Sequence, residues 1–479
     1  MDTLDLSKVQ HIHCIGIGGI GLSAIAEVLI NEGFKVSGSD MSESEKTDQL
    51  IAKGAKIYLR HRARNVGEAD LVVYSSAVPP NNPELEAAAA KGIPAITRAQ
   101  MLGHLMQQKK VSVAVAGAHG KTTTTSIISL ILMNAGLDPT ILVGGNLGEI
   151  NGNVRLGSGE YFVTEACEYM DSFLSLAPMY AVILNIDSDH LDYFKNIEQI
   201  VKSFEKFVRL VPPDGAVVAF DANPFVTTIL RGLDRRVITY GYSNRNDYSA
   251  GDIEWNSEGH PSFTVYSGDA ALARVQLAIP GEHNILNALA AFSCCCDMGV
   301  SHELIAETLE KFTGTERRFD IKGVTAGGVK IVDDYAHHPE EIAATIRAAR
   351  KVPHRELWIL FQPHTYTRTL ALHDDFAQTL TAADKVILAE IYAAREKNVH
   401  QISSKTIAAE IKAKAPGKDV FFFDTFEDIA KFVYNNAEKD DLVITMGAGD
   451  IYKVGELILE FDDESFVKER DIIRGKKID

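Results

Sequence analysis

The chain has few cysteines, no long hydrophobic run and no excess of basic residues. Its 479 residues include 5 Cys and 2 Trp, and 65 acidic against 48 basic side chains give a formal net charge of −17. This balance argues against nonspecific binding to nucleic acid or a membrane surface, for which a basic patch is typical. No window reaches about 18 uninterrupted apolar residues, so we expect no membrane span.

The cysteines do not suggest a disulfide framework or a zinc site. They are Cys14, Cys167 and the run Cys294 to Cys296, an odd number with no metal-ligand spacing. We therefore expect reduced thiols that pack in a core, as is usual in cytoplasmic proteins. The first ten residues, MDTLDLSKVQ, are acidic and lack an apolar stretch, so we expect no signal peptide.

Strand and helix signals alternate from end to end, which predicts an α/β protein. The length suggests about three domains. The polar run QQKK that ends at Lys110 and a new unit near Gly314 place the boundaries. We predict domains over residues 1–108, 109–313 and 314–479.

The segment VSVAVAGAHGKTTTT is typical of a phosphate-binding loop. A buried strand leads into a glycine turn that starts at Gly117, and an apolar helix follows. Glycine lets backbone N–H groups point at phosphate, Lys121 can reach the β- and γ-phosphates, and the Thr122 hydroxyl can ligate Mg²⁺. Val115 stands where the full Walker spacing has glycine, so the loop is a shortened variant.

A second glycine turn, GIGGIG, follows the first predicted strand. Gly16, Gly18, Gly19 and Gly21 precede an amphipathic helix, and Asp40 ends the next strand. The pattern resembles the dinucleotide fingerprint, in which a diphosphate meets the helix N-terminus and the acid meets a ribose hydroxyl. A purely structural tight turn is the alternative.

Acidic residues follow two strands of the predicted central domain. Glu165 emerges directly from an apolar strand, where a carboxylate can hold Mg²⁺ beside the phosphates. His190 lies between acids in DSDHLD, which favours a metal ligand oriented by a carboxylate. We expect its neighbours Asp189 and Asp192 to be solvated loop residues.

Two polar clusters lie in turns of the third domain. One runs from Asp333 to His338, and the other contains His364, Tyr366 and Arg368. No further ligand follows the His-His pair at suitable spacing, so we favour substrate contact or helix capping over metal binding.

The order of these motifs resembles that of the Mur ligases of peptidoglycan precursor synthesis. The matching segments run from about His11 to Leu457 and read GIGGIG, SSAVPPNNPE, GAHGKTTT, EACEY, NIDSDHLDYF, PGEHNILNALAA, TERRFD, DDYAHHPEE, QPHTYTRT and GAGDIY. The resemblance implies an N-terminal Rossmann-like domain for a UDP-sugar and a central P-loop ATPase with a mainly parallel sheet. It implies a C-terminal Rossmann-like domain that binds the amino acid and closes over ATP.

The resemblance is strongest to the branch that joins L-alanine to the lactyl carboxylate of UDP-N-acetylmuramate. It implies that ATP phosphorylates this carboxylate and that the amine of L-alanine attacks the acyl phosphate. Mg²⁺, replaceable by Mn²⁺, is the implied metal. We expect a cytoplasmic protein that is a monomer or a homodimer. The closest rival within the family recycles an intact murein tripeptide.

The resemblance also implies roles for individual residues. The catalytic residues would be Lys121, Glu165, His190 and Arg368, and the metal ligands Thr122, Glu165 and His190. ATP would bind Gly117, His119, Gly120, Lys121, Thr122, Thr123, His283, Asn284, Asn287, Arg318 and Asp334. The UDP-sugar would bind Gly18, Gly19, Asp40, Ser76, Ala77 and Arg98. The amino-acid end would contact Tyr335, His338, His364 and Arg368.

Three positions depart from the family pattern. Ala118 stands where Thr or Ser is usual, EACEYMD replaces EADESD around Glu168, and Thr365 stands where many relatives have Arg.

Two other classes compete with the ligase interpretation. An NAD-linked oxidoreductase explains GIGGIG and Asp40 but leaves Lys121 and Thr122 unused. A P-loop regulatory protein would hydrolyse nucleotide without forming an amide.

Overall fold

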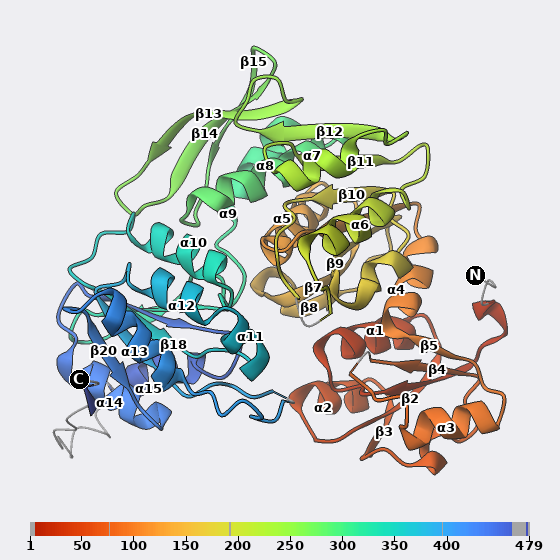
Figure 1. Ribbon diagram of the computed structural model, residues 1–479. Helices are drawn as coiled ribbons and strands as arrows, with labels where there is room; N and C mark the ends of the chain where they lie inside the picture. Colours follow the sequence, from red (N-terminus) through yellow and green to blue (C-terminus); the bar gives the residue numbers. More distant parts are fainter. Residues whose placement is uncertain (1–4, 76, 191–192, 395, 462–475, 478–479) are drawn as a thin grey trace. The chain divides into compact units, whose positions relative to one another are not determined.

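The computed structural model describes residues 5–75, 77–190, 193–394, 396–461 and 476–477, which form three β-sheets with helices (Figure 1). The chain divides into two compact units, Met1–Ile186 with Ile200–Thr239, and Asp187–Gln199 with Tyr240–Asp479. Within the described part of the chain, no helix is both long and apolar enough to cross a membrane.

The first sheet is wholly parallel, in the order β3-β2-β1-β4-β5. Its central strand reads HIHCI and is buried from its second residue onward. The strands are β1 (His11–Ile15), β2 (Lys35–Asp40), β3 (Lys56–Leu59), β4 (Leu71–Tyr74) and β5 (Ala95–Thr97). The helices are α1 (Ile20–Asn31), α2 (Glu45–Ala52), α3 (Pro83–Ala90) and α4 (Arg98–Gln107), with 3₁₀ turns η1 (Leu6–Lys8) and η2 (Ala63–Val66).

The second sheet has the order β11-β10-β6-β9-β7-β8 within the first unit. Strand β6 lies between β9 and β10 and is parallel to both, so Val115 pairs with Glu165 and Ala116 with Ile183. The strands are β6 (Val111–Ala116), β7 (Thr140–Leu147), β8 (Gly152–Arg155), β9 (Tyr161–Ala166), β10 (Tyr180–Ile183) and β11 (Ala216–Phe220). The helices are α5 (Lys121–Asn134), α6 (Ile197–Val208) and α7 (Pro224–Leu230), with η3 (Gly148–Ile150) and η4 (Tyr169–Ser175).

Strand β12 (Arg236–Gly241) contains the division between the units, and the second unit continues with an antiparallel β-meander. The meander is formed by β13 (Tyr248–Trp255), β14 (Pro261–Ser267) and β15 (Ala270–Gln276). Helices α8 (Glu282–Asp297) and α9 (His302–Lys311) follow. Cys294 and Cys295 are fully buried in α8, and all five thiols are free, as predicted.

The third sheet has the order β16-β17-β21-β18-β19-β20-β22 and is parallel from β17 to β20. Its strands are β16 (Asp320–Val324), β17 (Lys330–Asp334), β18 (Leu357–Phe361), β19 (Lys385–Leu388), β20 (Asp419–Phe422), β21 (Leu442–Met446) and β22 (Lys476–Lys477). Its helices are α10 (Pro339–Ala349), α11 (Tyr366–Ala371), α12 (His373–Leu380), α13 (Ser404–Lys414), α14 (Phe426–Asn436) and α15 (Tyr452–Glu460). The expected α/β class with mainly parallel sheets is confirmed.

Candidate active site

The predicted phosphate loop connects β6 to α5. Gly117 has a φ of +151° and Gly120 a φ of +86°, conformations that favour glycine. Gly117 is also tightly packed, since a Cβ there would lie 3.0 Å from Leu184 Cβ and 3.2 Å from the Asn185 nitrogen. The ammonium of Lys121 folds back over the loop and donates to the carbonyls of Gly117 and Ala118.

Glu168 is the ion-pair partner of this lysine. Its Oε2 lies 3.2 Å from Lys121 Nζ, and the two side chains are only 3% and 16% exposed. A phosphate on the loop would therefore compete with Glu168 for the ammonium. This gives Glu168 a role that its unusual sequence context left open.

Asn185 clamps the loop from the next strand. It follows β10, accepts from the His119 N–H at 2.9 Å and donates from Nδ2 to the His119 carbonyl at 3.0 Å. The two hydrogen bonds hold the backbone N–H and C=O of the same residue, so the loop conformation depends on a side chain that follows another strand. The sequence analysis did not predict a role for Asn185, although this residue begins the NIDSDH segment that contains the predicted metal ligand His190.

Glu165 is the penultimate residue of β9, the strand beside the phosphate-loop strand. Its Oε1 accepts from the Gly144 N–H at 2.6 Å, and a Cβ at Gly144 would approach the carboxylate to 2.7 Å. Thr122 lies in the first turn of α5 and is 8% exposed. A carboxylate near the end of β9 and a hydroxyl at the start of α5 are hard oxygen donors, so these residues fit Mg²⁺.

The N-terminal glycine turn is held by Asp40. Its Oδ2 accepts from the Gly18 N–H at 2.8 Å and its Oδ1 from the Met41 N–H at 2.7 Å. A Cβ at Gly18 would lie 3.0 Å from Oδ2, whereas a Cβ at Gly19 would meet only the Gly16 carbonyl at 3.5 Å. The N-cap of α1 is Gly19, which has no side chain to cap the helix, so the N-terminal N–H groups of α1 suit an anion.

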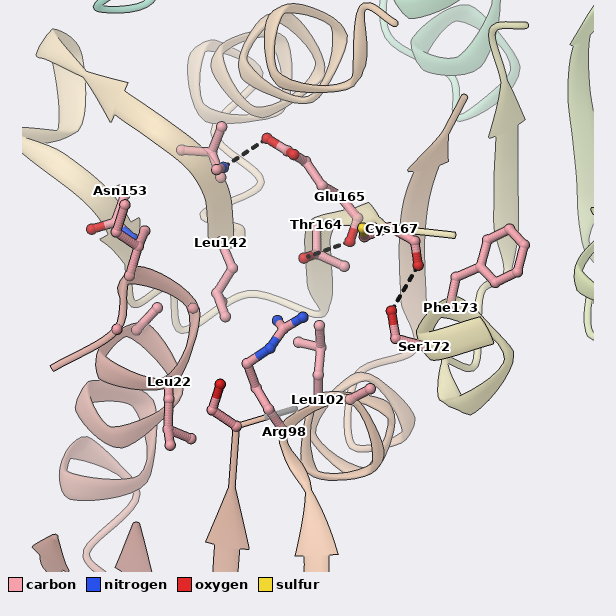
Figure 2. Close-up of a pocket in the computed structure, with 18 of the residues that line it drawn as sticks. Leu22, Arg98, Leu102, Leu142, Asn153, Thr164, Glu165, Cys167, Ser172 and Phe173 are labelled. Carbon is pink, nitrogen blue, oxygen red and sulfur yellow. Dashed lines mark hydrogen bonds between the residues drawn. The ribbon is translucent and has the colours of Figure 1, made fainter. Parts of the chain in front are cut away.

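A cavity of about 350 Å³ lies between this glycine turn and the end of β9 (Figure 2). Gly19, Arg98 and Glu165 contribute its polar wall, while Leu102, Leu142 and Phe173 are among its apolar residues. The Arg98 guanidinium extends into the cavity. Of the other predicted sugar contacts, Ala77 is exposed and Ser76 lies outside the described residues.

The predicted adenine contacts lie at the start of α8 in the second unit. Asn284 and Asn287 are each 6% exposed. Asn287 Nδ2 donates to Asn284 Oδ1 at 3.0 Å, and Asn284 Nδ2 donates to the Pro280 carbonyl at 2.7 Å. His283 packs against Gly281, where a Cβ would lie 2.6 Å from the imidazole. The two amides therefore form one ordered patch.

Arg318 and Asp334 are neighbours. Asp334 accepts from the N–H groups of Phe319 and Ala336 at 2.9 and 2.8 Å. Burial raises the pKa of Asp334 to about 6, although the Arg318 charge works in the opposite direction. Arg317 is committed elsewhere, because it donates to Asp333 at 2.9 Å and to the Gly447 carbonyl at 2.7 Å.

Arg368 is paired with Asp189. Its Nη2 donates to Asp189 Oδ1 at 3.1 Å, and the His190 N–H donates to the same oxygen at 2.6 Å. Burial opposes ionisation of Asp189, but His190 and Arg368 hold its pKa well below the usual range. The expectation of a solvated loop residue is wrong for Asp189, which is 9% exposed. Asp192 lies outside the described residues.

The His-His turn begins α10. His338 is its N-cap and accepts from the Glu340 N–H at 3.4 Å, so the predicted capping role is present. Tyr335 lies under the Arg317 and Arg318 guanidinium groups. His364 stacks on Tyr392 with ring centroids 5.6 Å apart. These residues place aromatic and cationic groups around the turn, while their contact with substrate stays a prediction.

The fold and the phosphate-type loop are those of a multidomain α/β enzyme. Three family descriptions match in order: "Mur ligase family, catalytic domain" over residues 11–110, "Mur ligase middle domain" over 115–295 and "Mur ligase, glutamate ligase domain" over 317–449. The chain belongs to the Mur ligase family, and it is a ligase.

Individual relatives agree with this assignment. A UDP-N-acetylmuramate–L-alanine ligase of Acetivibrio thermocellus is 50% identical over 96% of this chain and 98% of its own length. One of Caldanaerobacter subterraneus subsp. tengcongensis is 50% identical over 95% and 99%. The UDP-N-acetylmuramate–alanine ligase structure of Thermotoga maritima matches with a TM-score of 0.80, at 30% identity over 95% and 99% of the two chains. The murein peptide ligase of Psychrobacter arcticus matches at 0.71, with 27% identity and the same coverage.

Proposed function

We propose that this protein uses ATP to join L-alanine to the lactyl carboxylate of UDP-N-acetylmuramate through an acyl phosphate, a step of peptidoglycan precursor synthesis. The observation that carries the proposal is the position of Glu165. It lies one residue before the end of the strand beside the phosphate-loop strand, and it lines the same cavity as Arg98 and the glycine turn. A sugar nucleotide in this cavity has one end beside the residues suited to the phosphates of ATP.

The first half-reaction transfers the γ-phosphoryl group to the lactyl carboxylate, and ADP leaves. Phosphoryl transfer mainly requires positioning and charge neutralisation. Lys121 neutralises the β- and γ-phosphates, and the N–H groups of the loop from Gly117 to Thr123 cradle them. Gly18, Gly19 and Arg98 hold the diphosphate and sugar, with Ser76 and Ala77 beside them. Asp40 shapes the turn.

Thr122 and Glu165 would hold one Mg²⁺ or Mn²⁺, and His190 a second. The metal ions would withdraw charge from the phosphoryl oxygens. Glu165 is oriented for this role by the Gly144 N–H, which occupies one carboxylate oxygen and leaves the other for a ligand. His283, Asn284 and Asn287 would bind adenine, and Arg318 and Asp334 the triphosphate and ribose.

The second half-reaction forms the amide. The alanine amine attacks the acyl carbon, the tetrahedral intermediate collapses, and inorganic phosphate leaves while the nitrogen loses a proton. Arg368 suits the alanine carboxylate, because guanidinium recognises carboxylates in a bidentate manner. Tyr335, His338 and His364 complete the amino-acid end.

A phosphate-release assay tests the proposal. Purified protein with ATP and UDP-N-acetylmuramate should release phosphate when L-alanine is added, and the product should gain one alanine by mass spectrometry. Release with the intact murein tripeptide but not with alanine would favour the recycling ligase. NADH binding without sugar-nucleotide binding would instead support an oxidoreductase, and release without a new amide a regulatory P-loop protein.

Three further assignments belong to this proposal. We place the domain boundaries after residues 108 and 313, the enzyme in the cytoplasm, and its oligomeric state at a monomer or homodimer. Size-exclusion chromatography with light scattering would test the last.

A further inference from the structure

The wall of the cavity contains a buried amide with an unused donor. Asn153 lies on β8, is 5% exposed and lines the cavity beside Leu142 (Figure 2). Its Nδ2 is shielded from water and has no hydrogen-bond acceptor among the residues described. A buried donor without a partner is energetically unfavourable. Its position beside a cavity therefore indicates that a ligand supplies the acceptor.

Lys46 fixes which way this amide faces. Its Nζ lies 3.0 Å from Asn153 Oδ1. An ammonium group can only donate, so the atom that it contacts must be the amide oxygen. The NH₂ group is then turned the other way, and Figure 2 shows the nitrogen on the cavity side. The contact with Lys46 therefore fixes the orientation of the amide.

The charge of the cavity favours an oxygen-rich ligand at this point. The Arg98 guanidinium extends into the same cavity, and the uncapped N-terminus of α1 opens onto it at Gly19. Both attract anionic oxygen atoms. The positive charge of Arg98 and of the helix N-terminus attracts any anionic oxygen. The NH₂ group of Asn153 adds a directional hydrogen bond, which favours one position of the acceptor oxygen over others.

We propose that Asn153 binds the sugar nucleotide directly, by donating a hydrogen bond from Nδ2 to one of its acceptor oxygens, and that Lys46 is the positioning residue that orients the amide. This inference rests on the proposed function and deepens it, because it adds a substrate contact from the central sheet. A UDP-sugar offers acceptor oxygens on both its diphosphate and its sugar.

Asn153→Asp provides the sharpest test. The new carboxylate still accepts from Lys46, but it replaces the donor with a second acceptor that repels the substrate oxygen. Titration calorimetry should show UDP-N-acetylmuramate binding at least about tenfold weaker, with ATP affinity within about twofold and an unchanged melting temperature. Asn153→Ala, which introduces no charge, should also weaken the binding of the sugar nucleotide. It replaces the first variant in the test if Asn153→Asp folds poorly.

Asn151→Asp is the matched control. Asn151 is exposed and lies two residues away, so the same change of charge there should leave both affinities unchanged. Lys46→Met should weaken the binding of UDP-N-acetylmuramate less than Asn153→Ala does, because the Asn153 donor remains but is no longer oriented. Titration with UDP alone locates the contact: an equal loss places the oxygen on the diphosphate, and no loss places it on the sugar.

Two results would overturn the inference. One is UDP-N-acetylmuramate affinity within about twofold of wild type in both Asn153 variants. The other is an equal loss of both ligands together with a lower melting temperature, which would make the Lys46–Asn153 contact purely structural. If the wild type itself did not bind UDP-N-acetylmuramate, the proposed function would fail instead.

Discussion

Lys121 is the residue whose charge the reaction most needs, and it is also part of a buried ion pair. The Lys121→Ala variant should lose at least about a hundredfold in kcat, equal to about 2.7 kcal/mol in the barrier, because the transferred phosphoryl group loses its cation. Steady-state phosphate release measures this loss. Lys110→Ala is the control, since Lys110 is 73% exposed in its pair with Glu160 and should leave kcat unchanged.

The same substitution leaves Glu168 buried without its cation, so some loss of stability is expected. Circular dichroism at the assay temperature separates the two effects. A folded variant that retains more than about a tenth of wild-type kcat would contradict the phosphate role of Lys121.

The two central glycines of the N-terminal turn differ in what a side chain would meet. At Gly18 it would press on Asp40, whereas at Gly19 it would make only ordinary contact, and the extended backbone there accepts valine. Gly19→Val should therefore fold normally but block the approach of the diphosphate. Calorimetry should show UDP-N-acetylmuramate binding weakened at least about tenfold and ATP affinity within about threefold.

Gly18→Ala is the informative comparison, because it should also lower the melting temperature through its contact with Asp40. Normal sugar-nucleotide affinity in Gly19→Val would separate the glycine turn from substrate binding and favour its purely structural interpretation.

At the scale of elements, the sequence predicts what local geometry determines. A buried strand, two glycines and Lys121 specify the strand–loop–helix unit, because glycine conformation and helix entry depend on neighbouring residues. The clamp by Asn185 could not be predicted, since it joins residues 66 positions apart in the chain. The role of Asn153 could not be predicted for the same reason, because its unused donor is recognised only when the contact with the distant Lys46 is known.

The turn between β17 and α10 carries two opposite pH effects. Burial raises the pKa of Asp334 from 3.8 to about 6, so its contribution to stability is present at low pH and is lost as pH rises through 6. Burial also lowers the pKa of His337 from 6.5 to about 4, with Arg368 acting in the same direction and Glu341 against it. Its contribution is present above pH 6.5 and is lost as pH falls through 4.

Because each shift is worth on the order of 3 kcal/mol, the two effects largely cancel between pH 4 and 6.5 in the wild type. Replacing either Asp334 or His337 should therefore expose the pH dependence of stability that the other residue causes. Relative to wild type, Asp334→Asn should gain melting temperature as pH rises from 4.5 to 6.5, and His337→Gln should lose it. Thermal unfolding of the intact chain at several pH values measures both trends, and parallel curves for all three proteins would contradict the assignment.

At the scale of the whole molecule, the family assignment rests on the order of motifs along nearly the full chain. The sequence predicted three α/β sections because strand and helix periodicity repeats throughout, and the three sheets bear this out. It could not predict that residues 187–199 belong with the second unit, because such membership depends on contacts between distant segments. This grouping brings Asp189 to Arg368.

The two cationic residues proposed to hold substrate carboxylate and phosphate groups belong to different units, which predicts separable effects. Arg368→Lys keeps a cation for Asp189 but loses bidentate recognition, so KM for L-alanine should rise at least about tenfold while UDP-N-acetylmuramate affinity stays within about twofold. Arg98→Lys should weaken UDP-N-acetylmuramate binding and leave KM for L-alanine nearly unchanged, because Arg98 lines the cavity of the first unit. Initial rates with varied alanine, together with calorimetry for the sugar nucleotide, give both quantities for each variant. If both variants weakened both ligands equally while their melting temperatures stayed unchanged, the division of the substrates between Arg98 and Arg368 would be wrong.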